Sequence, residues 1–98
     1  MGRLLYGPQE REVEIDDRAL AHVQIVIVGK LRRAESFTFT WTAPDGEGRV
    51  AIWLHPAIPV QFQFDRTATE RIDAAWLKAL SDSAARGDLQ LSQEPKAT

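Results

Sequence analysis

Two runs of alternating residues, separated by a turn, constrain the fold of this chain more than any other feature. In "SFTFTWT" (residues 36–42) aromatic side chains alternate with serine and threonine, and in "RVAIWLH" (residues 49–55) branched apolar residues alternate with alanine, tryptophan and histidine. Alternation with period two is typical of a strand with one buried face. The intervening "APDGEG" has the composition of a turn. We therefore expect a β-hairpin in which the following residues face each other across the strands: Trp41 and Val50, Phe39 and Ile52, and Phe37 and Leu54.

Four further short strands are predicted outside the hairpin. "RLLY" and "EVEI" flank a Gly-Pro turn near the N-terminus, and "DLQLS" near the C-terminus suits a short edge strand. In "PVQFQF" the alternation directs Val60, Phe62 and Phe64 toward the core and Gln61 and Gln63 toward solvent.

Two helices complete the pattern. In "DDRALAHVQIVIVGKLRRA" an aspartate supplies the N-cap, and apolar residues recur along one helical face: Leu20, Val23, Ile27, Leu31 and Ala34. In "TATERIDAAWLKALSDSAARG" Thr67 and Glu70 match a capping box, and Gly87 is a stop signal. The expected apolar face of this second helix consists of Ile72, Ala75, Trp76, Ala79 and Leu80.

The order ββαβββαβ predicts an α+β fold, in which a mainly antiparallel sheet carries both helices on one face in a single two-layer domain. A chain of 98 residues has room for one domain. We expect the domain to span residues 1–91, with residues 92–98 as a flexible tail.

Composition excludes several classes of function. The chain has no cysteine, which excludes disulfides, thiolate metal sites and cysteine nucleophiles, and its net charge of −2 disfavours a dedicated nucleic-acid-coating protein. The N-terminal residues lack the apolar core of a signal peptide, and the longest apolar run is far shorter than a membrane span. A cytoplasmic protein is therefore expected.

Neither histidine belongs to a recognisable catalytic or metal-binding motif. His22 and His55 are far apart in the sequence and neither has a second ligand at metal-binding spacing, so we expect no metal and no cofactor. Ser36 lies beside His55 in the expected hairpin, which leaves a small hydrolase-like enzyme as one hypothesis, although no Gly-x-Ser-x-Gly turn is present. The simpler interpretation is that His55 ends a strand before Pro56.

Two predicted surfaces remain as candidate partner-binding sites. On the first helix, a basic stripe contains Arg18, His22, Arg32 and Arg33, flanked by Ile25 and Val26. An apolar patch with an arginine rim is common at protein interfaces, although the stripe is also compatible with an ordinary solvated helix face. On the outer face of the strands, Trp53 is expected to lie among Thr38, Thr40, Gln61 and Gln63 as a contact platform, or as a single surface tryptophan.

These surfaces favour a non-enzymatic binding or interaction module, with a second copy of the chain or another protein as partner and a homodimer as one form. The alternative is a nucleic-acid accessory module in which Arg18, Arg32, Arg33 and Arg49 contact phosphates and Trp53 stacks on a base. No membrane partner is expected.

The segments "EIDDRALAH", "KLRRAESFTFTW", "WLHPAIPVQFQF" and "AWLKAL" resemble a family of uncharacterised actinobacterial proteins of roughly 100 residues. Members of that family often carry the label "ATP-dependent DNA ligase", and the resemblance covers nearly the whole chain. A ligase of that class needs a lysine nucleophile in a Lys-x-Asp-Gly setting, whereas Ala43 stands at the lysine position before Asp45 and Gly46. The resemblance therefore implies at most an association with a ligase, and no site residues follow from it.

Overall fold

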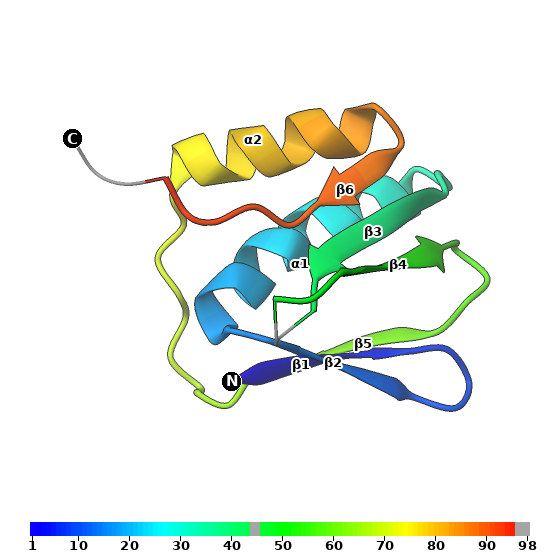
Figure 1. Cartoon of the computed structure of the whole chain (residues 1–98), viewed down its shortest axis with the longest axis horizontal. Coiled ribbons are helices and arrows are strands. Elements are labelled where there is room, and N and C mark those ends of the chain that lie inside the picture. Colours follow the sequence, from blue (N-terminus) through cyan, green and yellow to red (C-terminus); the bar gives the residue numbers. More distant parts are fainter. Residues whose placement is uncertain (44–45, 96–98) are drawn as a thin grey trace.

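A computed structural model describes residues 1–43 and 46–95 of the chain (Figure 1). Its elements in chain order are β1 (Gly2–Tyr6), β2 (Arg11–Ile15), α1 (Asp17–Arg32), β3 (Phe37–Thr42), β4 (Arg49–Leu54), β5 (Val60–Gln63), α2 (Ala74–Ala85) and β6 (Asp88–Gln90). The predicted α+β class and the order ββαβββαβ are confirmed.

The strands divide between two small sheets, where a single sheet was expected. One sheet has the order β2-β1-β5 and the other β4-β3-β6, and every pair is antiparallel except β3 with β6. In Figure 1 the first sheet lies at the bottom, the second sheet lies above it, and α2 lies along the top beside β6. Each sheet therefore combines a local hairpin with a third strand from a distant part of the chain.

The hairpin of β3 and β4 has the predicted register. Trp41 pairs with Val50, Phe39 with Ile52 and Phe37 with Leu54. The three aromatic side chains of β3 are buried, because this register directs them all toward the interior. The opposite face of the hairpin carries the threonines of β3 and the indole of Trp53.

Helix α1 begins and ends with recognisable caps. The Asp16 carboxylate accepts a hydrogen bond from the Ala19 N–H at 3.3 Å. Three predicted core residues, Leu20, Val23 and Ile27, are fully buried, whereas Leu31 is half-buried. Ala34 lies beyond the end of the helix and is exposed, so its predicted place on the buried face is wrong.

The C-terminus of α1 ends in a left-handed residue that is not glycine. Ala34 has φ of 59°, its N–H donates to the Leu31 carbonyl, and the Glu35 N–H donates to the Lys30 carbonyl. This double hydrogen-bond pattern is a Schellman motif, in which glycine usually occupies the left-handed position. The Cβ of Ala34 therefore adds strain at the helix end.

Replacing Ala34 with glycine is expected to raise the free energy of unfolding by about 1 kcal/mol, since the substitution removes that strain. The measurement is urea denaturation followed by circular dichroism. The control Ala79→Gly, at an exposed position within α2, is expected to lower the same quantity by about 1 kcal/mol. Equal destabilisation by both substitutions would contradict the role assigned to Ala34.

Helix α2 starts later than the sequence pattern predicts. Its N-cap is Asp73, whose carboxylate accepts from the Trp76 N–H at 3.0 Å, and residues 67–73 are not helical. The predicted capping box of Thr67 and Glu70 is therefore wrong, and Glu70 instead accepts a hydrogen bond from the Arg66 guanidinium. The buried residues of α2 are Trp76, Leu80, Ser83 and Ala84. Ile72 lies before the helix, and Ile72, Ala75 and Ala79 are exposed, so their predicted place on the buried face is wrong.

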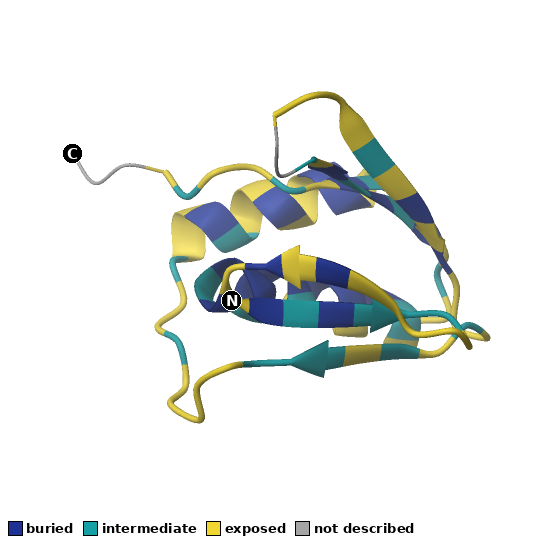
Figure 2. Ribbon diagram, turned by 60° about the horizontal axis from the view of Figure 1, so that its bottom comes forward, coloured by how far each residue is buried: buried dark blue, intermediate teal, exposed yellow. Residues whose placement is uncertain are grey.

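The core lies between the helices and the inner faces of both sheets (Figure 2). It includes Leu4 of β1 and Leu89 of β6, which are both fully buried. Gly2 of β1 is packed closely, because a Cβ at this position would lie 2.6 Å from the Asp17 Oδ1 and 2.8 Å from the Gln63 carbonyl oxygen. Asp17 is itself buried and accepts hydrogen bonds from the N–H groups of Asp65 and Arg66.

Candidate functional site

Trp53 lies on the outer face of the β4-β3-β6 sheet, and 50% of its surface is exposed. On this face Thr38 stands beside Trp53 and Asp88, while Thr40 stands beside Ala51 and Gln90. We call the outward-facing residues of the three strands the Trp53 face: Thr38, Thr40, Thr42, Arg49, Ala51, Trp53, Asp88 and Gln90.

The polar groups around Trp53 are bonded to one another. The hydroxyls of Thr38 and Thr40 donate to Asp88 Oδ1 at 2.7 and 2.8 Å, and the Gln90 amide donates to Asp88 Oδ2 at 3.0 Å. The hydrogen bonds from Gln90, Thr38 and Thr40 hold the pKa of Asp88 below its ordinary value of 3.8. Because these groups already have partners, covering them would cost less desolvation free energy than covering unpaired groups.

Gln61 and Gln63 do not belong to the Trp53 face, although the sequence pattern grouped them with it. Both lie in β5, which pairs with β1 in the other sheet. The sequence showed that they alternate with core residues, but it did not show that β4 and β5 belong to different sheets.

The predicted basic stripe on α1 is not formed. Arg18 donates from Nε to Glu94 Oε1 at 2.8 Å and from Nη2 to Glu94 Oε2 at 2.5 Å, and it also donates to the Arg71 carbonyl. The Arg18 guanidinium lowers the pKa of Glu94 below its ordinary value of 4.5. This bidentate ion pair holds the segment after β6 against α1.

His22 is completely buried, so its predicted place on a solvent-exposed stripe is wrong. Its Nδ1 is 2.7 Å from the Arg18 carbonyl oxygen and its Nε2 accepts from the Asp73 N–H at 2.8 Å, an arrangement that requires the proton on Nδ1. The ring also packs on Trp76 with 4.4 Å between centroids. His22 thus joins α1 to the N-terminus of α2.

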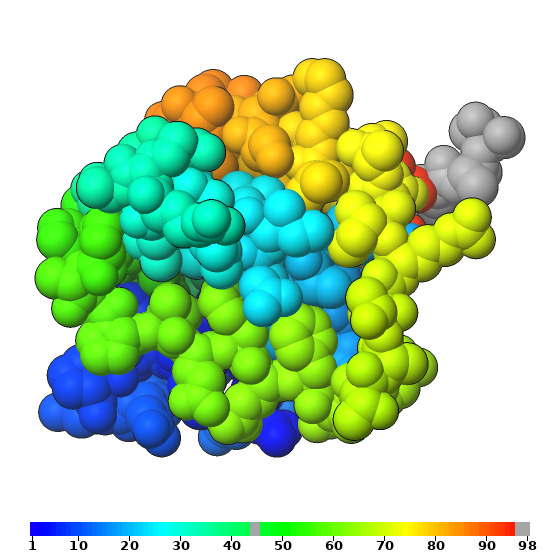
Figure 3. Space-filling view, turned by 180° about the vertical axis from the view of Figure 1, so that it is seen from behind, coloured from blue at the N-terminus to red at the C-terminus, as the bar shows by residue number. Residues whose placement is uncertain are grey.

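The C-terminal part of α1 carries the remaining arginines. Arg32 and Arg33 are both exposed, and Arg33 pairs with Glu35 at 3.1 Å. Lys30 pairs with the same Glu35 at 2.9 Å, and its ammonium group lies over the Phe37 ring. Both Lys30 and Arg33 lower the pKa of Glu35, and the effect of Lys30 is the larger. Of the two apolar residues expected beside the stripe, Ile25 is exposed and Val26 is buried. Figure 3 shows this side of the molecule, with α1 between α2 and the segment that contains β5.

His55 is exposed immediately after β4 and accepts the Ala57 N–H on Nδ1 at 3.0 Å. This contact shapes the turn before β5, in agreement with the prediction of a strand end. No hydrogen bond joins His55 to Ser36 in the described part of the chain. Within residues 1–43 and 46–95, no group of three or more histidine, aspartate or glutamate side chains is arranged to hold a metal ion.

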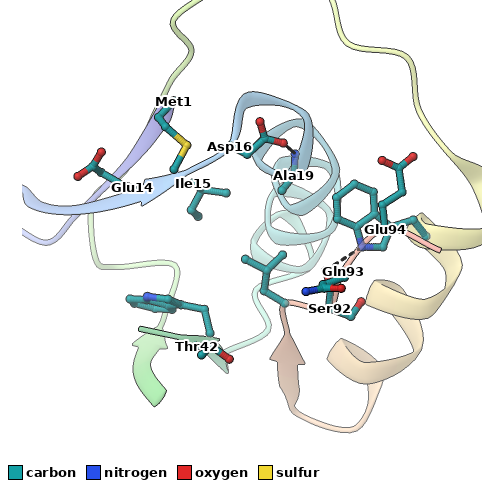
Figure 4. Close-up of a pocket in the computed structure, with 12 residues that line it drawn as sticks. Met1, Glu14, Ile15, Asp16, Ala19, Thr42, Ser92, Gln93 and Glu94 are labelled. Carbon is teal, nitrogen blue, oxygen red and sulfur yellow. Dashed lines mark hydrogen bonds between the residues drawn. The ribbon is translucent and has the colours of Figure 1, made fainter. Parts of the chain in front are cut away.

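A pocket of about 530 Å³, which the sequence pattern did not indicate, lies where the end of β2, the end of β3 and the start of α1 meet the segment after β6 (Figure 4). Its residues are Met1, Glu14, Ile15, Asp16, Ala19, Trp41, Thr42, Trp76, Leu91, Ser92, Gln93 and Glu94. The Trp76 indole donates to the Ser92 carbonyl at 3.2 Å and so helps to hold the wall formed by residues 91–94. We call this cavity the two-tryptophan pocket.

No helix in the described ranges is long and apolar enough to cross a membrane. A family model described as "Domain of unknown function (DUF7882)" matches residues 1–94. No curated protein and no solved structure matches the chain.

Proposed function

Since the chain belongs to the DUF7882 family, whose description assigns no activity, we propose from the geometry that the domain is a non-catalytic interaction module. Its partner is a second copy of the same chain, and the two copies pack through their Trp53 faces. The observation that carries the proposal is the half-exposed indole of Trp53 on a sheet face whose polar groups already bond one another.

The charges of the Trp53 face support self-association. Arg49 and Asp88 lie toward opposite corners of the face, Arg49 beside Thr42 and Asp88 beside Thr38, and they are its two formal charges. Two such faces of balanced charge do not repel each other, whereas two faces of one sign would.

The order of residues along β4 favours one arrangement of the two copies. Arg49, Ala51 and Trp53 follow one another along the outer side of the strand. Consider a two-fold axis that lies in the plane between the two faces and crosses the direction of β4 near Ala51. This axis places Trp53 of each copy opposite Arg49 of the other. Arginine over an indole face is a favourable cation–π pair, and the symmetry produces it twice. The small side chain of Ala51 allows the sheets to approach between these pairs.

Sedimentation velocity over a range of protein concentrations tests the proposal. We expect the sedimentation coefficient to rise with concentration from that of one copy to that of two. Trp53→Gln is expected to weaken association about thirtyfold, because a central tryptophan is worth about 2 kcal/mol at an interface. Arg49→Ala is expected to weaken it by a smaller factor.

Two matched variants serve as controls. Ile25→Gln removes an apolar residue of similar exposure from α1, and Arg32→Ala removes an exposed arginine from the same helix. Both are expected to leave association unchanged. A single copy at every concentration, or equal weakening by the Trp53 and Ile25 variants, would overturn the proposal.

The other functions considered from the sequence receive less support. Nucleic-acid binding required Arg18, Arg32, Arg33 and Arg49 to contact phosphates together, but Arg18 and Arg33 are paired with carboxylates. Arg32 and Arg49 belong to different elements, α1 and β4. A hydrolase required His55 to act with Ser36, but the Nδ1 of His55 is bonded to the Ala57 N–H. We therefore propose neither function, nor the ligase association implied by the resemblance.

A further inference from the structure

The two-tryptophan pocket has an apolar wall from several elements. Ile15 of β2, Ala19 of α1 and Trp41 of β3 are buried residues that line it, together with Trp76 of α2. The indole N–H of Trp76 is already bonded to Ser92, so this side chain offers the pocket carbon surface and no free donor. A cavity of about 530 Å³ with such a lining is within the size range of small-molecule sites.

The polar groups at the rim are predominantly acidic. Glu14 lies at one end of the rim and Glu94 at the other, with Asp16 between them, as Figure 4 shows, and no lysine or arginine lines the pocket. The charge of Glu94 is offset by its ion pair with Arg18. Neither Glu14 nor Asp16 forms an ion pair with a described residue, and both are exposed. The Met1 ammonium and the Ala19 N–H offset part of the Asp16 charge, and the Met1 ammonium is itself paired with Asp65. The part of the rim from Glu14 to Asp16 therefore attracts positive charge.

We propose that the two-tryptophan pocket binds a small aromatic amine. The aromatic body packs between Trp41 and Trp76, and the ammonium group reaches Glu14 and Asp16 at the rim. An apolar wall beside two exposed carboxylates that form no ion pair with described residues complements a ligand that is apolar at one end and cationic at the other. The pocket shares only Thr42 with the Trp53 face, and its two tryptophans and the carboxylates of Glu14 and Asp16 lie outside that face, so this inference does not depend on self-association.

The three tryptophans of the chain provide the readout, because each indole N–H gives one signal in a ¹H–¹⁵N NMR spectrum. The probe is phenethylamine, which is protonated at neutral pH. We expect saturable shifts of the Trp41 and Trp76 indole signals during the titration, while the Trp53 signal stays in place as an internal control. Substituting each tryptophan with phenylalanine in turn assigns the signals.

One uncharged analogue and one negatively charged analogue test the role of the amine. We expect 2-phenylethanol, which keeps the aromatic body and lacks the charge, to bind more weakly. We expect 3-phenylpropionate, which carries a carboxylate, to cause no saturable shift. Equal affinity for the alcohol and the amine would show that the carboxylates do not contribute and would overturn the proposal.

Variants of the rim test the residues assigned to the ammonium group. Glu14→Gln combined with Asp16→Asn is expected to weaken phenethylamine binding about tenfold, since each rim charge makes a modest contribution. Asparagine is as good an N-cap as aspartate, so α1 retains its start. The control Glu12→Gln removes a carboxylate from the same strand outside the pocket, and we expect affinity within about twofold of the original.

The same titration distinguishes the remaining outcomes. Unchanged affinity in the double variant, shifts confined to Trp53, or no saturable shift of any indole would each overturn the proposal. Loss of binding in the double variant with an otherwise unchanged spectrum would support it, because the fold is then shown to be intact.

Discussion

Replacing Gly2 with alanine is expected to lower the free energy of unfolding by about 2 kcal/mol, a cost typical of overpacking a buried site. The added Cβ would lie 2.6 Å from the Asp17 Oδ1, 2.7 Å from the Leu20 Cδ2 and 2.8 Å from the Gln63 carbonyl oxygen. The carbonyl belongs to β5 and the carboxylate is bonded to two backbone N–H groups, so neither can move without breaking other contacts. Thermal unfolding should show a midpoint lower by roughly 10 °C for a domain of this size.

Gly29→Ala is the matched control for this substitution. Gly29 lies within α1, and the nearest heavy atom to an added Cβ there is the Arg33 Nη1 at 3.9 Å. We expect this variant to be more stable by about 0.5–1 kcal/mol, because alanine has the higher helix propensity. Shifts of the same sign in both variants would contradict the close packing described for Gly2.

Replacing His22 with phenylalanine is expected to lower the free energy of unfolding by about 2–3 kcal/mol. Phenylalanine keeps a ring of similar volume against Trp76, but it cannot accept the hydrogen bond of the Asp73 N–H. That N–H lies at the N-cap of α2, so its loss of a partner is expected to loosen the contact between the two helices. Urea denaturation measures the effect.

The same substitution at the second histidine separates this effect from a general effect of phenylalanine. His55 is exposed and its bond to the Ala57 N–H lies at the surface, so we expect His55→Phe to change stability by less than about 0.5 kcal/mol. If the two variants were equally unstable, His22 would not have the linking role assigned to it.

Local patterns predicted the parts of the fold that depend on neighbouring residues. The register of β3 and β4 followed from the alternation alone, because shifting it by one residue would expose Phe37, Phe39 and Trp41 together. Gly87 was likewise identified as the stop of α2, and its φ of +94° is the conformation that only glycine adopts without strain.

Contacts between distant residues decided the parts that the sequence did not predict. Thr67 and Asp73 are both suitable N-caps, and the structure uses Asp73, whose N–H is bound by His22 from α1. His22 itself was placed on an exposed face because one buried stripe was assumed for α1, whereas α2 covers a second side of that helix. The two-tryptophan pocket combines residues from both halves of the chain, and no local motif indicates it.

The pairing of β1 with β5 and of β3 with β6 has a consequence for folding during synthesis. The β1–β2 and β3–β4 hairpins can form as soon as they leave the ribosome, but β1 lacks its other neighbour until residue 63 has emerged and β3 until residue 90 has emerged. Until then the edges of β1 and β3 that later pair with β5 and β6 are open in the nascent chain, and α2 lacks its contact with β6. Protection from misassembly therefore depends on β6, which is synthesised after most of the core residues.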